Sequence, residues 1–176
     1  MLLNATLSLL LMQQAPAENV DWDAEFGVEE VERDPATGEI PVEPYEQNNE
    51  NAGAKPFTGD DMAETFGGRD GIRQIAERFV EINFADPRIQ GIFAGHDEVR
   101  LRRTIFEQFC YILNAGCDYT GRDMKSSHEG LGSRKSDLNA IVENLQQAMR
   151  EQDVPFAAQN RFLSKLAPMS RDVINR

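Results

Sequence analysis

The stretch Tyr119-Thr-Gly-Arg-Asp-Met-Lys-Ser-Ser-His-Glu-Gly-Leu-Gly132 decides how the rest of this chain is interpreted. It contains His128, one of only two histidines in the sequence. Met124, His128 and Leu131 follow the spacing i, i+4 and i+7, which places them on one face of a helix. Asp123 is suited to start that helix and the glycines after His128 to end it, so a helix of about two turns is expected.

An imidazole on an apolar face has two common uses, and the spacing alone leaves both open. It can be a core histidine that donates a hydrogen bond to a nearby carbonyl oxygen. It can also ligate haem iron, because the iron binds a neutral imidazole nitrogen and the porphyrin needs apolar walls.

The 176 residues are enough for one domain with a real core, and their net charge of −12 is unevenly distributed. Residues 18–64 contain 15 acidic and 2 basic residues, a net charge of −13. Residues 65–176 contain 15 acidic and 16 basic residues, a net charge of +1. This balance does not favour nucleic acid as a partner.

Residues 1–17 form a Leu-rich run that ends in Ala-Pro-Ala. The run is too short to span a bilayer, and it fits a secretory signal cleaved before Glu18. No basic residue precedes it, because the first one in the chain is Arg33, so an unstructured N-terminus is the alternative. A signal predicts a periplasmic or secreted protein with no integral membrane segment in the mature chain. Without a signal the protein is expected in the cytoplasm.

Residues 18–60 show no sustained helical or strand period. Their acidity, prolines and scarce apolar residues predict a disordered extension with no chemistry of its own.

Cys110 and Cys117 are the only cysteines in the chain. Two thiolates are too few for a four-ligand zinc site, and their spacing is not C-x-x-C. An exported protein can join them in a disulfide. The alternative is one apolar core residue and one loop residue, and backbone geometry decides between the two.

From residue 61 onward apolar residues recur at helical spacing, without a strand or hairpin pattern. The domain 61–176 is therefore predicted to be all-α. The expected helices cover 61–66, 69–84, 88–93, 98–113, the His128 segment, residues 133 or 136 to 151 with a serine cap, and 155–174 with a kink at Pro168.

The helix expected over 98–113 has one broad apolar face, made of Leu101, Ile105, Phe109 and Ile112. Gln108 is the one polar residue within it. One side of a porphyrin needs such a face, although most faces of this kind are ordinary core.

Five motifs of this domain resemble those of group I truncated haemoglobins, in the same order. They are Gly67-Gly-Arg-Asp-Gly-Ile72, Phe84-Ala-Asp-Pro87, Phe93-Ala-Gly95, Tyr119-Thr-Gly-Arg-Asp-Met-Lys-Ser-Ser-His128 and Leu166-Ala-Pro168. The resemblance extends from about Met62 to Ile174. It implies a two-on-two helical sandwich around haem b, with His128 as the proximal ligand of the iron.

The resemblance also implies a set of haem-contacting residues. Phe93 corresponds to an aromatic residue stacked on the porphyrin, and Met124 to a residue packed beneath it. Arg100, Lys125 and Tyr119 correspond to positions that meet the haem propionates, with plain exposure as the alternative. The implied cofactor-binding set is Phe79, Phe93, Leu101, Ile105, Phe109, Tyr119 and Met124.

The sequence departs from the family pattern where the gaseous ligand is expected. Many members have Tyr at the position of Val80 and Gln at that of Ile105, and these side chains donate hydrogen bonds to bound O2. A hydrogen bond to a charged partner contributes about 1.5–3 kcal/mol, or roughly tenfold to over a hundredfold in affinity. An apolar distal pocket of Val80, Leu101 and Ile105 is therefore expected to release O2 quickly. Gln108 either reaches the ligand or lies at the rim.

Two further departures concern neighbouring loops. Asn114-Ala115 replaces the usual Gly-Gly after the helix 98–113. His96 lies between Gly95 and Asp97 in an expected loop, where it is either exposed or a sixth iron ligand.

Three functions compete on this evidence. The preferred one is reversible binding of O2, NO or CO at an iron held by His128, with no catalytic residue assigned. The second is a haem-dependent redox enzyme, an NO dioxygenase or a peroxidase, which needs an electron donor that the sequence does not identify. The third is a haem-free helical interaction module.

Overall fold

The computed structural model describes residues 31–176, of which Arg33–Arg176 form one compact unit. The described residues form helices and no strands, which confirms the all-α prediction. None of these helices is long and apolar enough to cross a membrane. The predicted signal segment 1–17 and residues 18–30 of the predicted extension lie outside the described residues.

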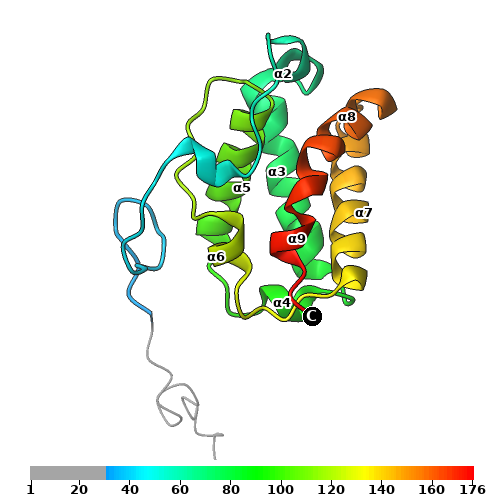
Figure 1. The fold of residues 1–176 in the computed structure, drawn as a ribbon. Coiled ribbons are helices and arrows are strands. Elements are labelled where there is room, and N and C mark those ends of the chain that lie inside the picture. The colour runs from blue at the N-terminus through cyan, green and yellow to red at the C-terminus, as the bar shows by residue number, and fades with distance from the viewer. Residues whose placement is uncertain (1–30) are drawn as a thin grey trace, which may run out of the picture. The chain divides into compact units, whose positions relative to one another are not determined.

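Four longer helices carry the fold (Figure 1): α3 (Gly68–Ala85), α5 (Glu98–Ile112), α7 (Lys135–Glu151) and α8 (Phe156–Leu166). The short elements are η1 (Asn49–Ala52), α2 (Asp61–Thr65), α4 (Gln90–Phe93), α6 (Met124–His128), η2 (Ala167–Met169) and α9 (Ser170–Val173). Every helix expected from the sequence is present.

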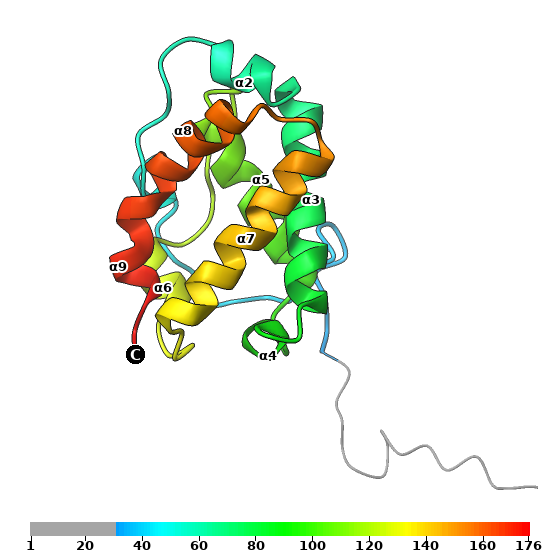
Figure 2. The same ribbon diagram turned by 90° about the vertical axis from the view of Figure 1, so that its right-hand side faces the viewer.

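The four longer helices pack as two pairs, the predicted two-on-two sandwich. Helix α3 packs against both α5 and α7, and α7 packs against α8 (Figures 1 and 2). Between the pair α3–α5 and the pair α7–α8, the Phe109 ring of α5 lies 5.1 Å from that of Phe162 of α8, edge to face. Within the first pair, the Phe109 ring lies 5.9 Å from that of Phe79 of α3. These are the centroid distances at which aromatic pairs attract.

The last helix breaks at the predicted proline. Helix α8 ends at Leu166, and Pro168 lies in the 3-10 segment η2 before α9 begins. The predicted serine cap of α7 is wrong. Arg134 occupies the cap position, and its N–H donates to the Asp137 carboxylate at 2.8 Å. The Ser133 hydroxyl instead donates to the carbonyl of Val173.

Residues 33–60 differ from the disordered extension that the sequence predicts, because they belong to the compact unit. Glu39 is 6% exposed and Ala52 is fully buried. The Glu39 carboxylate pairs with Arg103 of α5, and the N–H of Phe57 donates to the carbonyl of Ile112 at 2.8 Å. A buried carboxylate needs such a partner, and only the fold brings that partner to it.

The turn after α5 is closed by a disulfide between Cys110 and Cys117, whose Cα atoms lie 5.6 Å apart. Asn114 takes a left-handed conformation with φ 62° in this turn. Asparagine tolerates that conformation better than most residues, so the turn forms without the Gly-Gly pair.

We predict that the free energy of unfolding of the Cys117→Ser variant is lower by about 2–3 kcal/mol. The reason is that the cross-link of this short loop lowers the conformational entropy of the unfolded chain. Urea unfolding followed by circular dichroism measures this loss. Reduced wild-type protein is the control and should unfold like the variant. Equal stability of oxidised wild type and variant would show that the bridge adds nothing.

Candidate functional site

A cavity of about 930 Å³ lies among the longer helices and α6. Helix α3 contributes Phe79 to its wall, and α5 contributes Leu101, Ile105 and Phe109. The opposite side is formed by Leu138, Ile141 and Leu145 of α7, together with Leu163, Leu166 and Met169. Its volume and mainly apolar lining are typical of a site for a cofactor or small molecule.

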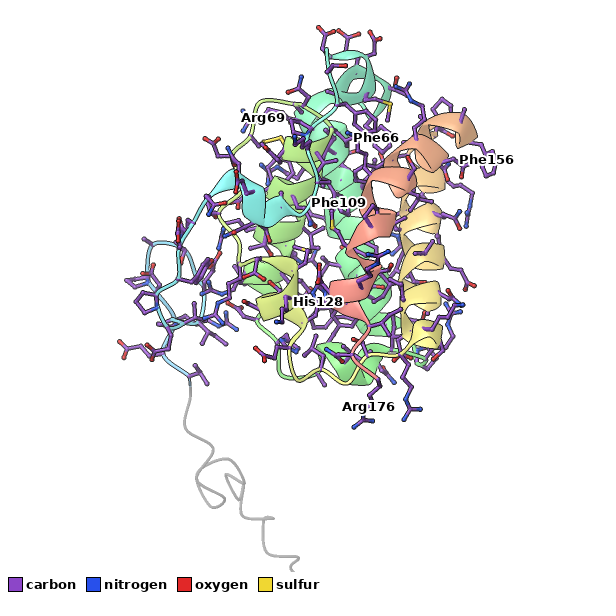
Figure 3. All side chains as sticks on the ribbon, viewed as in Figure 1. Phe66, Arg69, Phe109, His128, Phe156 and Arg176 are labelled. Carbon is purple, nitrogen blue, oxygen red and sulfur yellow. A yellow bond between two sulfur atoms is a disulfide. The ribbon has the colours of Figure 1, made fainter. Side chains whose placement is uncertain are left out.

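Helix α6 presents His128 to this cavity (Figure 3). Asp123 caps the helix as expected: its carboxylate accepts from the backbone N–H of Ser126 at 2.9 Å and from the Ser126 hydroxyl at 2.7 Å. The same two hydrogen bonds hold the pKa of the Asp123 carboxyl below its usual value. The helix has five residues and ends at His128, so it is shorter than the two turns expected, and Leu131 lines the cavity from beyond its end.

The half-buried imidazole of His128 is held by its own helix. Its Nδ1 lies 2.7 Å from the carbonyl oxygen of Met124, one turn earlier. A carbonyl oxygen only accepts, so Nδ1 carries a proton, and in the neutral ring Nε2 then keeps its lone pair. A neutral imidazole with an unprotonated Nε2 is the form that ligates a metal.

The Tyr119-Thr-Gly121 turn leads the chain into α6. Tyr119 is 5% exposed, and its hydroxyl donates to the carbonyl of Arg122 at 3.0 Å. Burial raises the pKa of this hydroxyl well above its usual value, so it stays protonated and keeps donating. A Cβ on residue 121 would lie 2.2 Å from the Tyr119 oxygen, so only glycine fits beneath the folded-back ring.

The structure brings together at one cavity all seven residues expected to bind the cofactor, and His128 with them. The seven are Phe79, Phe93, Leu101, Ile105, Phe109, Tyr119 and Met124. They come from α3, α4, α5, α6 and the turn before α6.

Two other expected positions lie elsewhere. Val80 was expected in the distal pocket, but it is 1% exposed and absent from the cavity wall, which α3 forms with Phe79 instead. Successive helix residues differ by 100° in direction, and Val80 lies on the side of α3 that is turned away from the cavity. Lys125 is exposed and outside the lining. Plain exposure is one of the two expectations for this residue.

Gln108 is buried and lines the cavity, but its amide is engaged by neighbouring groups. Its Nε2 donates to the carbonyl of Ala52 at 2.9 Å and lies 3.4 Å from Sδ of Met124 and 3.7 Å from Sδ of Met169. An amide nitrogen has two N–H groups, and these contacts use both. Gln108 of α5 therefore connects η1, α6 and η2, and it is buried rather than placed at the rim of the cavity.

One edge of the cavity is polar. Nη2 of Arg100 donates to the carbonyl of Ile40 and lies 3.3 Å from Oε2 of Glu39. Nε of Arg100 is buried and has no hydrogen-bond partner among residues 31–176. His96 also lines this cavity and is exposed, as one of its two expectations has it.

Sequence reasoning missed three lining residues on this side. Val42 and Tyr45 belong to the segment predicted to be disordered, and no periodicity marks them. Arg122 lies beside Tyr45, with its guanidinium 5.0 Å from the ring centre. By contrast, the lining residues of α7 could have been found, because their helical spacing already marks an inward face.

Comparison with known proteins gives a family match for residues 61–175, to the model described as bacterial-like globin. The group 1 truncated hemoglobin GlbN of Mycolicibacterium paratuberculosis is 26% identical over 110 residues, which cover 62% of this chain and 81% of the relative. That of Nostoc commune is 24% identical over 115 residues, covering 65% of this chain and 98% of the relative.

Solved structures with the same fold cover the same part of the chain. The truncated hemoglobin of Tetrahymena pyriformis in its Fe(III) form has a TM-score of 0.62 and 22% identity, covering 65% of this chain and 98% of that one. The cyanomet 2/2 hemoglobin of Synechococcus sp. PCC 7002, with covalently attached heme, has a TM-score of 0.60, 23% identity and the same coverages. Residues 31–60 precede the segment matched by the family model.

Proposed function

The chain belongs to the bacterial-like globin family, and on that premise we propose that it reversibly binds a diatomic gas at a haem iron held by His128. Globins are haem proteins that bind diatomic gases. The observation that carries the proposal for this chain is the hydrogen bond from His128 Nδ1 to Met124. In the neutral ring, this bond leaves the lone pair of Nε2 available to bind a metal at the wall of an apolar cavity.

The residues at the cavity fit haem b. Phe79, Phe93 and Phe109 offer apolar surface to a porphyrin. The unpartnered N–H of Arg100, at the polar edge, suits a propionate carboxylate, which would satisfy a buried donor. When bound, haem would supply an iron that can take O2, NO or CO, and His128 would hold that iron.

The residues of α5 would make the part of the cavity that receives the gas apolar, so that it discriminates weakly between gases. Leu101 and Ile105 present hydrocarbon to the cavity, and the N–H groups of Gln108 are used on Ala52 and two sulfur atoms. A polar ligand would thus find no side-chain donor from these three residues. We therefore propose that O2 dissociates quickly and that the site discriminates little between diatomic gases.

We predict that His128→Gly removes the normal Soret band of haem-reconstituted protein, while added imidazole restores it. The wild type should be five-coordinate in the ferrous form and bind CO. Absorption spectra of the ferric, ferrous and CO forms test this. A normal ferrous spectrum in the variant would exclude His128 as the ligand, and a six-coordinate ferrous wild type would point to His96 or another side chain at the second position.

We predict that Ile105→Gln slows O2 dissociation by about tenfold to a hundredfold, because it adds a donor for the bound ligand at the cavity wall. Stopped-flow displacement of O2 by CO measures the rate. Ile105→Leu keeps the wall apolar and should retain the wild-type rate. Equal rates for both variants would mean that position 105 does not face the ligand.

We also propose that the protein is exported. The proposal rests on the signal-like run 1–17 and on the Cys110–Cys117 disulfide, which persists in oxidising compartments. Full-length protein expressed in a Gram-negative host should appear in the periplasm with Glu18 as its first residue, by intact mass. Uncleaved protein found only in the cytoplasm would contradict this.

A further inference from the structure

The turn that leads into α6, residues 118–122, makes five hydrogen bonds with residues 43–51, which precede the family-matched segment. Tyr119 N–H donates to the Asn49 side chain at 2.7 Å, and the Tyr45 hydroxyl donates to the carbonyl of Thr120 at 2.9 Å. Three further bonds join the same segments: Asn49 to the Asp118 carboxylate at 2.9 Å, Asn51 to the Gly121 carbonyl at 3.2 Å and Arg122 to the Glu43 carbonyl at 3.2 Å.

A charged network ties the same turn to α5. The Glu39 carboxylate pairs with Arg103, whose Nη1 in turn lies 3.1 Å from Oε1 of Glu107. Glu107 accepts from the backbone N–H of Thr120 at 3.0 Å and from its hydroxyl at 2.7 Å. The pairing with Glu39 and Glu107 raises the pKa of Arg103, so this guanidinium stays charged. Glu39, although distant in sequence, is thus the outer end of a chain of contacts that reaches the turn.

The extension also touches α6 itself. Gly53 passes so close to Met124 that a Cβ at this position would lie 3.0 Å from Met124 Cγ. Gln108, anchored on the carbonyl of Ala52, reaches Sδ of Met124 at 3.4 Å. Met124 is the residue whose carbonyl holds the His128 ring.

We propose that residues 39–53, which precede the family-matched segment, position α6 and so fix the imidazole of His128. A five-residue helix is not stable by itself and depends on contacts with its surroundings. One such contact, from Asn175 to the His128 carbonyl, lies at its C-terminal end. At its N-terminal end, residues 43–53 contact the turn 118–122 and Met124, together with Glu107 and Gln108 of α5. Asn49 and Tyr45 are therefore positioning residues, and their role toward haem rests on the proposed function above.

The test compares the full chain with the double variant Tyr45→Phe/Asn49→Ala, which removes the two side chains that hold Tyr119 and Thr120. Gln47→Ala is the matched control, because Gln47 is exposed in the same segment and makes no side-chain hydrogen bond among the described residues. The double variant removes three hydrogen bonds, two of them neutral and one to the Asp118 carboxylate. Their loss corresponds to roughly tenfold or more in an equilibrium. In the haem-free protein, the backbone amide hydrogens of 118–128 should exchange with solvent about tenfold faster in the double variant than in wild type. In the control variant they should exchange at the wild-type rate.

In the haem-loaded protein, the double variant should lose haem to apomyoglobin about tenfold faster. It should also shift the iron–histidine stretching band of the ferrous form, which a merely structural change elsewhere would not move. Unchanged amide exchange, or faster exchange with an unmoved band, would overturn the inference. Failure of wild type to take up haem would instead overturn the proposed function, and amide exchange in the haem-free protein would still decide whether the extension holds α6.

Discussion

The hydrogen bond from His128 Nδ1 to the carbonyl oxygen of Met124 is the interaction on which the site depends. It sets the tautomer, and so it decides which nitrogen keeps a lone pair at the cavity. Both partners lie within one five-residue helix, so the bond is local. The orientation of that helix is not local, because it is set by the turn before it and by packing on both sides.

The cavity exists because the two helix pairs meet through a few large aromatic rings. Phe109 contacts Phe79 and Phe162, and the aliphatic residues of α7 close the far side. The hydrocarbon walls suit the apolar faces of a porphyrin. At one edge of the cavity Arg100 lies beside the Glu39 carboxylate and the carbonyl of Ile40.

The extension changes how the acidity of this chain is understood. Acidic residues of an N-terminal segment are usually solvated, yet Glu39 is buried against Arg103. Removing Arg103 would leave the buried Glu39 carboxylate with Arg100 as its remaining cation. Weakening the compensation of a buried charge costs more than losing an exposed ion pair. The residues around it supply hydrogen bonds to a turn whose backbone would otherwise have no partner at those atoms. The segment from Arg33 onward thus packs with the helices as part of one compact unit.

The sequence by itself determined the all-α class, the helices to within a few residues, the break at Pro168, and the meeting of His128 with the seven expected cofactor-binding residues, because these follow from local periodicity and a specific motif. It also identified Asp123 as the cap of α6. Only the tertiary structure decided that Phe79 and not Val80 faces the cavity, that Gln108 binds the Ala52 carbonyl, that Cys110 and Cys117 are joined, and that residues 33–60 are ordered. Each of these depends on which partner lies opposite a side chain, and contacts between residues far apart in sequence leave no local pattern to read.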